Sequence, residues 1–591
     1  MLPPPSRRRF VQGLALASGA AVIGAPIWTR AQGVGADPTM LTGNKLDLTI
    51  GERPINITGK RRMATAVNGQ VPGPTLRLRE GDDVIIAVTN RLREPTSIHW
   101  HGFRLPANMD GVPGLTFKGI MPGETFTYRF PIVQSGTYWY HSHSGMQEQT
   151  GLYGAVVLEP KQRPPYAFDR EYVIVLSDWT DENPMTVVAN MKMQGDYYNF
   201  HQRTLGTFLD DTRRKGFKAT LADWSMWGAM RMSPTDIMDV TGATYTFLIN
   251  GQPPASNWTA LFAPGERVLL RFINSAAMST FDVRIPGLPL TVVAADGGDV
   301  QPVVVDQFRI GVAETYDVIV EPKADLAYTI FAQAEDRTGY ARATLATRAG
   351  AAGAIPPMDH RPMRTMADMG MAGMDMGGGA KPGADMAGMK MGGMKMGASA
   401  QSGGKMAGMS EMPASKTPAV NADHVDPKKL PGQVNVDNVA VETQNRQGQP
   451  GAGLAGEDRT TLVYADLKAL TPHQDARPVD RDIEFHLTGN MQRWTWGFDG
   501  KKFSQVGPID VRLGETVRFV LINDTMMEHP IHLHGFLFSL ENGNTGDLPL
   551  KHTVNVKPGE RLSFVFTADT PGHWAFHCHL LYHMETGMFR T

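Results

Sequence analysis

The chain has 591 residues, more than one hydrophobic core usually supports, so three or four domains of roughly 150 residues are expected. Hydrophobic residues make up 42% of it and charged residues 20%, and the 63 glycines and 41 prolines favour short strands joined by turns over long helices. The net charge of −2 gives no sign of a nucleic-acid partner, and the single cysteine, Cys578, excludes an intramolecular disulfide.

The N-terminal residues resemble an export signal. Three arginines in the phrase SRRRFV precede a Gly/Ala-rich apolar stretch that runs to about Ile27, and a small residue stands at Ala31. This pattern looks like a twin-arginine signal, so we predict that residues 1–31 are removed and that the mature protein is periplasmic. A membrane anchor is the alternative, but the apolar run is short and weakly hydrophobic for a span of about 20 residues.

A fixed spacing recurs three times along the chain and indicates duplicated domains. Each copy has Val three residues after Gly and Asn nine residues after it: Gly81, Val84 and Asn90; Gly265, Val268 and Asn274; Gly514, Val517 and Asn523. The residues between are aliphatic runs bounded by turn signals, as in buried strands. We therefore expect three related β-sandwich domains, with a helical excursion at about residues 200–240 of the middle one.

Histidine pairs separated by one residue mark two of these domains. They are His99 and His101, His141 and His143, His532 and His534, and His577 and His579. Residues i and i+2 of a strand face the same way, so each pair can aim two imidazoles at one target. A single pair could be a chance repeat, but these occupy matched places in the first and third domains. We expect a copper cluster of eight imidazoles at the interface of those domains.

Cys578 indicates a second site in the third domain. It lies between two of the paired histidines, so its side chain must point to the opposite side of its strand. The candidate ligands are two histidines, one thiolate and one thioether: His529, Cys578, His583 and Met588. This set is typical of blue copper. Zinc is the rival metal, but its structural sites usually hold more thiolates and its catalytic sites do not need four histidine pairs.

The other domains lack parts of these sets. The first domain has Ser142, Gln147 and Leu152 where the third has Cys578, His583 and Met588. In the middle domain, Val283 and Ile285 occupy the places of the first histidine pair, and neither can bind a metal. The middle domain is therefore interpreted as a spacer.

Four motifs resemble the signatures of three-domain multicopper oxidases: HWHG at 99–102, HSH at 141–143, HPIHLH at 529–534 and HCHLLYHMETGM at 577–588. The resemblance implies an all-β fold of three cupredoxin-like Greek-key β-sandwich domains with a disordered Met-rich insertion. The implied boundaries are 45–165, 166–348 and 456–591 for the domains and 349–455 for the Met/Gly-rich flexible linker.

The same resemblance implies four copper ions and assigns their ligands. The type 1 ligands would be His529, Cys578, His583 and Met588; the type 2 ligands His99 and His532; the type 3 ligands His101, His141, His143, His534, His577 and His579. Electrons would pass from Cys578 to His577 and His579 and would reduce dioxygen to water. Asp110 resembles the family's acid near the type 2 site, which makes it a candidate proton donor.

The methionines of the linker indicate which reducing substrate the protein oxidises. The linker holds 15 of the 34 methionines, between Met358 and Met412, among Gly, Ala and Lys residues that cannot form a core. Thioethers prefer Cu(I), so we expect extra Cu(I) to bind there, although a plain flexible linker stays possible. With the phrase HLTGNMQRW at 486–494, the chain resembles the bacterial copper-resistance protein A group, which implies oxidation of Cu(I) to Cu(II) for copper tolerance.

Three other functions are weighed against this one. A laccase-like oxidase of phenols or amines would take a small organic reductant, and deletion of 358–412 should then raise phenol oxidation. A copper-sequestering protein would keep full tolerance after Cys578→Ser. A copper nitrite reductase would not require eight cluster histidines. The expected partners are O2, the reductant and periplasmic copper-binding proteins, and the protein is expected to be a monomer.

Overall fold

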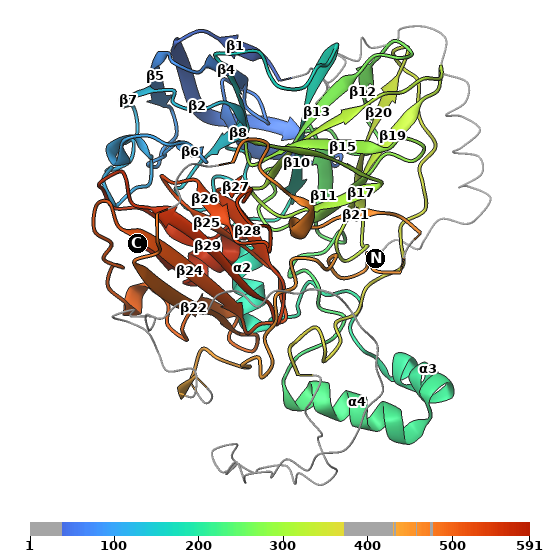
Figure 1. Cartoon of the computed structure of the whole chain (residues 1–591). Coiled ribbons are helices and arrows are strands. Elements are labelled where there is room, and N and C mark those ends of the chain that lie inside the picture. Colours follow the sequence, from blue (N-terminus) through green and yellow to red (C-terminus); the bar gives the residue numbers. More distant parts are fainter. Residues whose placement is uncertain (1–37, 372–428, 431–432, 457, 473–476) are drawn as a thin grey trace, which may run out of the picture.

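Three β-sandwiches make up the computed structural model, which describes residues 38–371, 429–430, 433–456, 458–472 and 477–591 (Figure 1). Each sandwich contacts the other two. The first meets the second where the Thr137 hydroxyl donates to Asp317 Oδ1 at 2.6 Å, and it meets the third through stacked histidine rings. The second and third share one hydrophobic cluster. The expectation of an all-β protein is confirmed.

The first sandwich packs a sheet in the order β3-β2-β5-β7 against a sheet in the order β1-β4-β9-β8-β6. Its strands are β1 Met40–Thr42, β2 Lys45–Asn56, β3 Arg61–Val67, β4 Thr75–Arg79, β5 Asp83–Asn90, β6 His99–His101, β7 Thr125–Pro131, β8 Gly136–His141 and β9 Tyr153–Glu159, with the 3-10 turn η1 Ala107–Met109. Strand β2 alternates exposed and buried residues from Lys45 to Ile50, as a strand with one face in the core must. The histidine-bearing strand β6 is at the edge of its sheet.

The second sandwich pairs six strands, in the order β11-β10-β13-β18-β15-β16, with six more, in the order β12-β20-β19-β14-β17-β21. The strands are β10 Arg170–Trp179, β11 Thr246–Ile249, β12 Trp258–Leu261, β13 Val268–Asn274, β14 Phe281–Arg284, β15 Leu290–Ala295, β16 Gly298–Val305, β17 Gln307–Ile310, β18 Thr315–Val320, β19 Tyr328–Ala334, β20 Tyr340–Ala346 and β21 Thr461–Leu462. The last of these follows the linker in sequence, yet it pairs with β17.

Helices interrupt the second sandwich between β10 and β11. They are α2 Pro184–Met193, α3 Leu205–Lys215 and α4 Phe217–Ala229. The Asn183 side chain accepts a hydrogen bond from the N–H of Met185 and caps α2, while Thr204 caps α3. The predicted helical excursion is confirmed, and Figure 1 shows α3 and α4 projecting from the body of the molecule. Among the described residues, no helix combines the length and the apolar character that crossing a bilayer would need.

The third sandwich joins a sheet in the order β23-β22-β24-β29-β26-β27 to one in the order β28-β25-β30-β31. Its elements are η4 Tyr464–Asp466, β22 Arg481–Asn490, β23 Thr495–Phe498, η5 Phe503–Gln505, β24 Thr516–Asn523, β25 His529–Leu533, β26 Phe538–Leu540, β27 Leu550–Lys551, β28 Thr553–Val556, β29 Arg561–Thr567, β30 Phe576–Cys578, α5 Leu581–Thr586 and β31 Phe589–Arg590. Strand β25 carries His529 and His532, strand β30 carries His577, and His534 and His579 each follow directly after one of these strands.

The repeated asparagine makes the same contacts in all three sandwiches. The buried amides of Asn90, Asn274 and Asn523 each donate to the carbonyl of a residue 30 to 36 positions later, and each Oδ1 accepts from the backbone N–H two residues on. Each asparagine ends its strand, so its side chain closes the turn that follows. The repeat in the sequence therefore has a structural cause.

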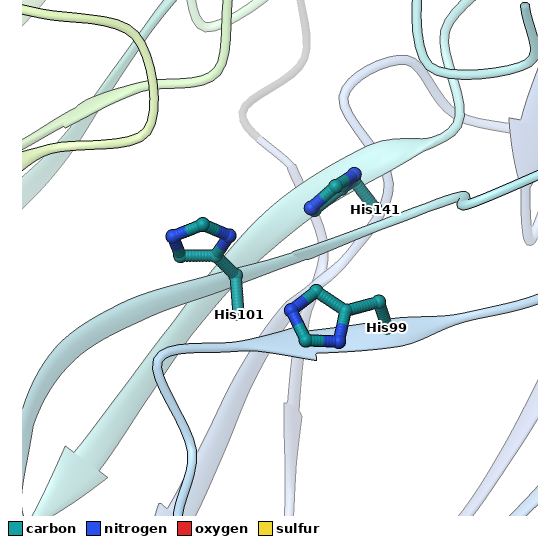
Figure 2. Close-up of side chains that lie close together, drawn as sticks. All are labelled: His99, His101 and His141. Atoms are coloured by element: carbon teal, nitrogen blue, oxygen red, sulfur yellow. The ribbon is translucent and has the colours of Figure 1, made fainter. Parts of the chain in front are cut away.

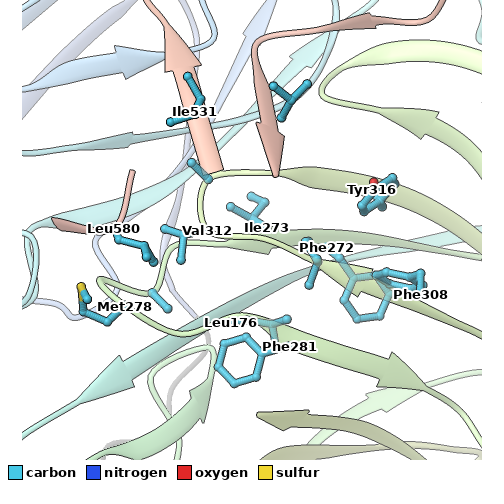
Figure 3. Packing of buried hydrophobic residues seen from close by; sticks show 14 of the residues in the cluster. Leu176, Phe272, Ile273, Met278, Phe281, Phe308, Val312, Tyr316, Ile531 and Leu580 are labelled. Atoms are coloured by element: carbon cyan, nitrogen blue, oxygen red, sulfur yellow. The ribbon is translucent and has the colours of Figure 1, made fainter. Parts of the chain in front are cut away.

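One hydrophobic cluster runs through the second and third sandwiches. Figure 3 shows Phe272, Phe308 and Tyr316 of the second sandwich in the same cluster as Ile531 and Leu580 of the third. The two sandwiches therefore share a continuous core. The strands that carry Ile531 and Cys578 belong to this core and pack with residues of the second sandwich.

The two described ends of the predicted flexible linker are packed, which corrects the expectation that residues 349–455 are flexible throughout. Met369 and Leu430 are fully buried, and the Arg364 guanidinium lies 3.2 Å from Glu335 Oε1 in the second sandwich. Arg446 also pairs with Asp368 and ties the end of the linker to its beginning. The prediction of flexibility rested on the average composition of the segment, which does not reveal these few side chains that anchor its ends. The central methionines, within 372–428, lie outside the described residues.

Candidate metal centre

Strand pairing brings the histidines of each domain together. In the first sandwich, β6 pairs with β8 so that His99 faces His141, while Trp100 between the two histidines of β6 enters the core. Figure 2 shows the imidazoles of His99, His101 and His141 lying close together. In the third sandwich, β25 pairs with β30, and His532 faces His577. The alternation of the strands thus aims the imidazoles away from each core.

The two sets meet at the interface of the first and third sandwiches. The rings of His101 and His532 are stacked with centroids 3.8 Å apart, and those of His99 and His534 are 3.9 Å apart. Other ring contacts between the two domains include His141 with His579 at 4.9 Å and His143 with His577 at 5.1 Å. All eight predicted histidines therefore lie in one cluster, half from each domain.

The chemistry of this cluster fits a bound cation. The ring nitrogens His99 Nε2, His101 Nδ1, His143 Nε2 and His532 Nε2 are buried and have no hydrogen-bond partner among the described residues. Other ring nitrogens face each other: His534 Nε2 lies 2.9 Å from His577 Nε2, and His141 Nε2 lies 3.3 Å from His579 Nε2. Burial lowers the pKa of His577 to about 4, so its ring is neutral. Buried lone pairs directed at one another need a metal ion to stabilise them.

Hydrogen bonds on the outer side of the rings select which nitrogen faces inward. Asp110 joins the two domains, because its backbone carbonyl accepts from His99 Nδ1 at 2.8 Å and its Oδ2 lies 2.9 Å from His534 Nδ1. Its Oδ1 also lies 3.2 Å from His99 Nδ1. The predicted acid is therefore in contact with the cluster and is 2% exposed. His532 Nδ1 donates to the carbonyl of His552 at 2.6 Å. Such contacts orient metal-binding imidazoles.

A second cluster forms on the opposite side of β30. Cys578 Sγ lies 3.5 Å from His529 Nδ1 and 3.9 Å from His583 Nδ1, and all three residues are buried. The other nitrogen of each ring is bound elsewhere: His529 Nε2 to the Thr525 hydroxyl at 2.7 Å, and His583 Nε2 to Asp239 at 2.7 Å. Burial raises the pKa of the Cys578 thiol, so a thiolate there needs a cation beside it.

Met588, the fourth predicted ligand, lies beside Cys578. It is fully buried, and its carbonyl accepts from the Cys578 N–H at 3.1 Å, which holds its backbone next to Cys578, directly before β31. In the first sandwich, Gln147 accepts hydrogen bonds from Ser142 and from Thr96, and Leu152 is buried. The polar groups of Ser142 and Gln147 are thus hydrogen-bonded within the first sandwich, and none of the three side chains offers a sulfur or imidazole ligand.

Sequence reasoning missed three side chains of the site: Glu148, Asp239 and His552. Glu148 Oε2 lies 2.6 Å from His141 Nδ1, and His552 Nδ1 lies 3.2 Å from His101 Nε2. The closeness of Glu148 to the second histidine pair in sequence was a usable signal. Asp239 gave none, because it is 344 residues from the histidine that it contacts.

Comparisons with known proteins agree with this geometry. Three family models described as multicopper oxidase match residues 49–163, 170–350 and 476–591. The chain belongs to the multicopper oxidases. Copper resistance protein A from Escherichia coli is 52% identical to this multicopper oxidase, over 100% of this chain and 99% of that protein. The copper resistance protein A homolog of Pseudomonas syringae pv. tomato is 53% identical, over 99% and 98%.

A solved structure supports the fold. The crystal structure of Fet3p, a multicopper oxidase that functions in iron import, covers 93% of this chain and 90% of that one, with a TM-score of 0.62 and 21% identity. The expectation of three cupredoxin-like domains is confirmed. The protein is therefore a copper-dependent oxidoreductase with O2 as the electron acceptor, and the buried histidine clusters are where its copper cofactors would bind.

Proposed function

We propose that this multicopper oxidase oxidises Cu(I) to Cu(II) and couples that oxidation to the four-electron reduction of O2 to water. The observation that carries the proposal is the similarity to two proteins named for copper resistance, which extends over nearly the full length of this chain and of each relative. The methionines between Met358 and Met412 support the same substrate, because thioethers prefer Cu(I).

We assign the ligands as the resemblance suggested. The type 1 site would be held by His529, Cys578, His583 and Met588, the type 2 site by His99 and His532, and the type 3 pair by His101, His141, His143, His534, His577 and His579. When bound, the four copper ions supply four one-electron centres, as many as the reduction of one O2 to two waters requires.

The chain connects the two proposed copper sites and shields the connection from solvent. Cys578 is bonded through the backbone to His577 on one side and His579 on the other, so the tripeptide joins the two clusters covalently. All three residues are buried, which keeps bulk water away from the path between the clusters.

Asp110 would supply protons. Its carboxyl group contacts one histidine from each domain and is buried at their interface. A proton held on Asp110 Oδ1 or Oδ2 could therefore reach the cluster without crossing bulk solvent.

The remaining assignments concern export and organisation. We propose that residues 1–31 are a twin-arginine signal and that the mature protein works in the periplasm as a monomer, supplied by copper-binding proteins. We place the domains at 45–165, 166–348 and 456–591 and extra Cu(I) sites on the linker methionines. N-terminal sequencing of the exported protein would test the signal, and a first residue before 32 would contradict it.

Oxygen consumption with Cu(I) as sole electron donor tests the function. The copper-loaded enzyme should take up O2 in a saturable manner, and Cys578→Ser should abolish that uptake because it removes the thiolate of the type 1 site. Uptake no greater than that of the Cys578→Ser variant would reject Cu(I) as substrate. Rapid uptake with phenols in that case would favour the laccase-like reading instead.

A further inference from the structure

A cavity of about 480 Å³ lies between the second and third sandwiches. Two segments of the second sandwich line it, residues 193–196 at the end of α2 and residues 231–233 with Asp236 after α4, and Met491 and Gln492 form the wall from the third sandwich. Gly195 lets these walls meet, because a Cβ atom there would lie 2.2 Å from the Met491 carbonyl oxygen. The cavity therefore depends on both sandwiches.

The lining combines soft ligands with negative charge. Met193, Met232 and Met491 bring three thioethers, and Asp196 and Asp236 bring two carboxylates. The Arg231 guanidinium also lines the cavity, but it donates to Gln492 Oε1 at 2.5 Å. Thioethers select Cu(I), and a carboxylate neutralises the charge of a cation that leaves water.

Asp236 is the strongest indication that the cavity can bind a cation. It is 3% exposed, and its Oδ1 has no hydrogen-bond partner among the described residues, although it lines the cavity. Burial raises the pKa of this carboxyl group, and the nearby carboxylates of Asp239 and Asp196 raise it further. A buried acceptor with no donor is costly, and a cation would remove the cost.

Both walls continue inward to the type 1 cluster. Asp239, three residues after Asp236, lies 2.7 Å from His583 Nε2. Trp494, three residues after Met491, donates through Nε1 to Asp239 Oδ1 at 3.0 Å, and Trp496 stacks on the His583 ring at 3.9 Å. The cavity therefore lies one layer of side chains outside the predicted electron-accepting site.

The cavity also adjoins the segment that leads into the methionine-rich linker. The Arg364 N–H donates to the Pro234 carbonyl at 2.9 Å, and the Arg361 guanidinium donates to the Thr235 carbonyl at 3.4 Å. Met363, between these two arginines, is 54% exposed. The described start of the linker thus runs along the loop that carries Asp236.

From these contacts we infer that the cavity is the binding site for substrate Cu(I), with Met232, Met491 and Asp236 as ligands. The inference rests on the proposed function. It gives the phrase HLTGNMQRW a role, because Met491, Gln492 and Trp494 of that phrase form the cavity wall and its contact with Asp239.

The test uses Ag(I), a soft monovalent ion that does not donate electrons under these conditions, on the full-length, copper-loaded enzyme. Methionine methyl groups labelled with carbon-13 report each site by NMR, and Met232→Leu and Met491→Leu assign the two signals. We expect both signals to shift together on titration. Asp236→Asn should raise the Kd read from them by at least about tenfold, because a neutral amide replaces a carboxylate.

Met185→Leu is the matched control, since Met185 lies on α2, is 60% exposed and is outside the cavity. It should leave that Kd within about twofold. Unmoved signals from Met232 and Met491, or an unchanged Kd in Asp236→Asn, would overturn the inference. If Cu(I) drives no O2 uptake but Ag(I) binds as expected, the cavity is a soft-cation site with these ligands, and Cu(I) as the substrate of the oxidase, the proposed function, is rejected.

Discussion

At the scale of single residues, the partner of one imidazole nitrogen decides what the other can bind. Thr525 and Asp239 occupy the Nε2 atoms of His529 and His583, so both Nδ1 atoms face Cys578 Sγ. In His532 the roles of the two nitrogens are reversed. Its Nδ1 donates to the backbone carbonyl of His552, and its Nε2 has no hydrogen-bond partner among the described residues. The geometry of the two proposed metal centres is therefore set by the side chains around them as well as by their proposed ligands.

Asp110→Asn tests the proposed proton donor at this scale. Asparagine keeps the size of the side chain but cannot release a proton, so kcat for O2 reduction should fall by roughly 100-fold. The KM for Cu(I) and the blue absorption should stay as in the wild type, because Asp110 does not contact the Cys578 cluster. Steady-state oxygen uptake measures both constants, with the exposed Glu124→Gln as control. A kcat within about threefold of the wild type would contradict the role.

At the scale of elements, a buried charge pair joins strand β22 to the turn after β24. His486 Nδ1 lies 2.6 Å from Asp524 Oδ2, and His486 Nε2 lies 3.6 Å from Glu484 Oε1. Burial alone would lower the pKa of His486, but the hydrogen bonds to these carboxylates outweigh it and raise the pKa to about 9. The charged imidazole therefore helps to hold the third sandwich together.

This pair predicts a pH-dependent stability. The pKa of His486 is higher in the folded state than in the unfolded state, so its contribution is complete below about pH 6.5 and is lost as the pH rises through about 9. The loss can reach roughly 3 kcal/mol. Urea unfolding at several pH values should show this decline in the wild type and a smaller one in His486→Gln. Equal slopes in the two proteins would reject the prediction, and exposed His573→Gln is the control.

At the scale of the whole molecule, a buried ionic cluster joins the second sandwich, the third sandwich and the linker. The Arg309 guanidinium lies 2.8 Å from Asp282 Oδ1 and 2.8 Å from Glu528 Oε1, and Glu528 directly precedes His529, a proposed type 1 ligand. Arg364 of the linker shares Glu335 with it. The position of the proposed type 1 site thus depends on contacts among three parts of the chain.

Arg309→Leu should leave buried carboxylates without their counter-charge and lower the free energy of unfolding by about 3–5 kcal/mol. Arg170→Leu, which breaks a partly exposed pair with Glu266, should cost no more than about 1 kcal/mol. Urea unfolding followed by fluorescence and by the blue absorption measures both variants. A similar decrease in the free energy of unfolding in both variants would contradict the prediction that the buried cluster stabilises the fold more than an exposed ion pair does.

Much of this protein could be predicted from the sequence because the relevant patterns are local. Strand alternation places two imidazoles on one side of a strand and Cys578 on the other, and it needs no distant partner. The Gly, Val and Asn spacing predicts equivalent strands and turns, which the asparagine hydrogen bonds explain. The three sandwiches, the helical excursion and the convergence of the histidine pairs all followed from such patterns.

The tertiary structure decided what joins these local pieces. Asp239 reaches His583 across 344 residues, and Asp110 reaches His534 across 424, distances at which a single sequence carries no periodic signal. The ends of the linker pack because Arg364 and Met369 find partners in sandwiches formed elsewhere in the chain. Burial and charge pairing depend on which surfaces meet, so the support of the metal centres and the cavity beside Met491 appear in the folded molecule alone.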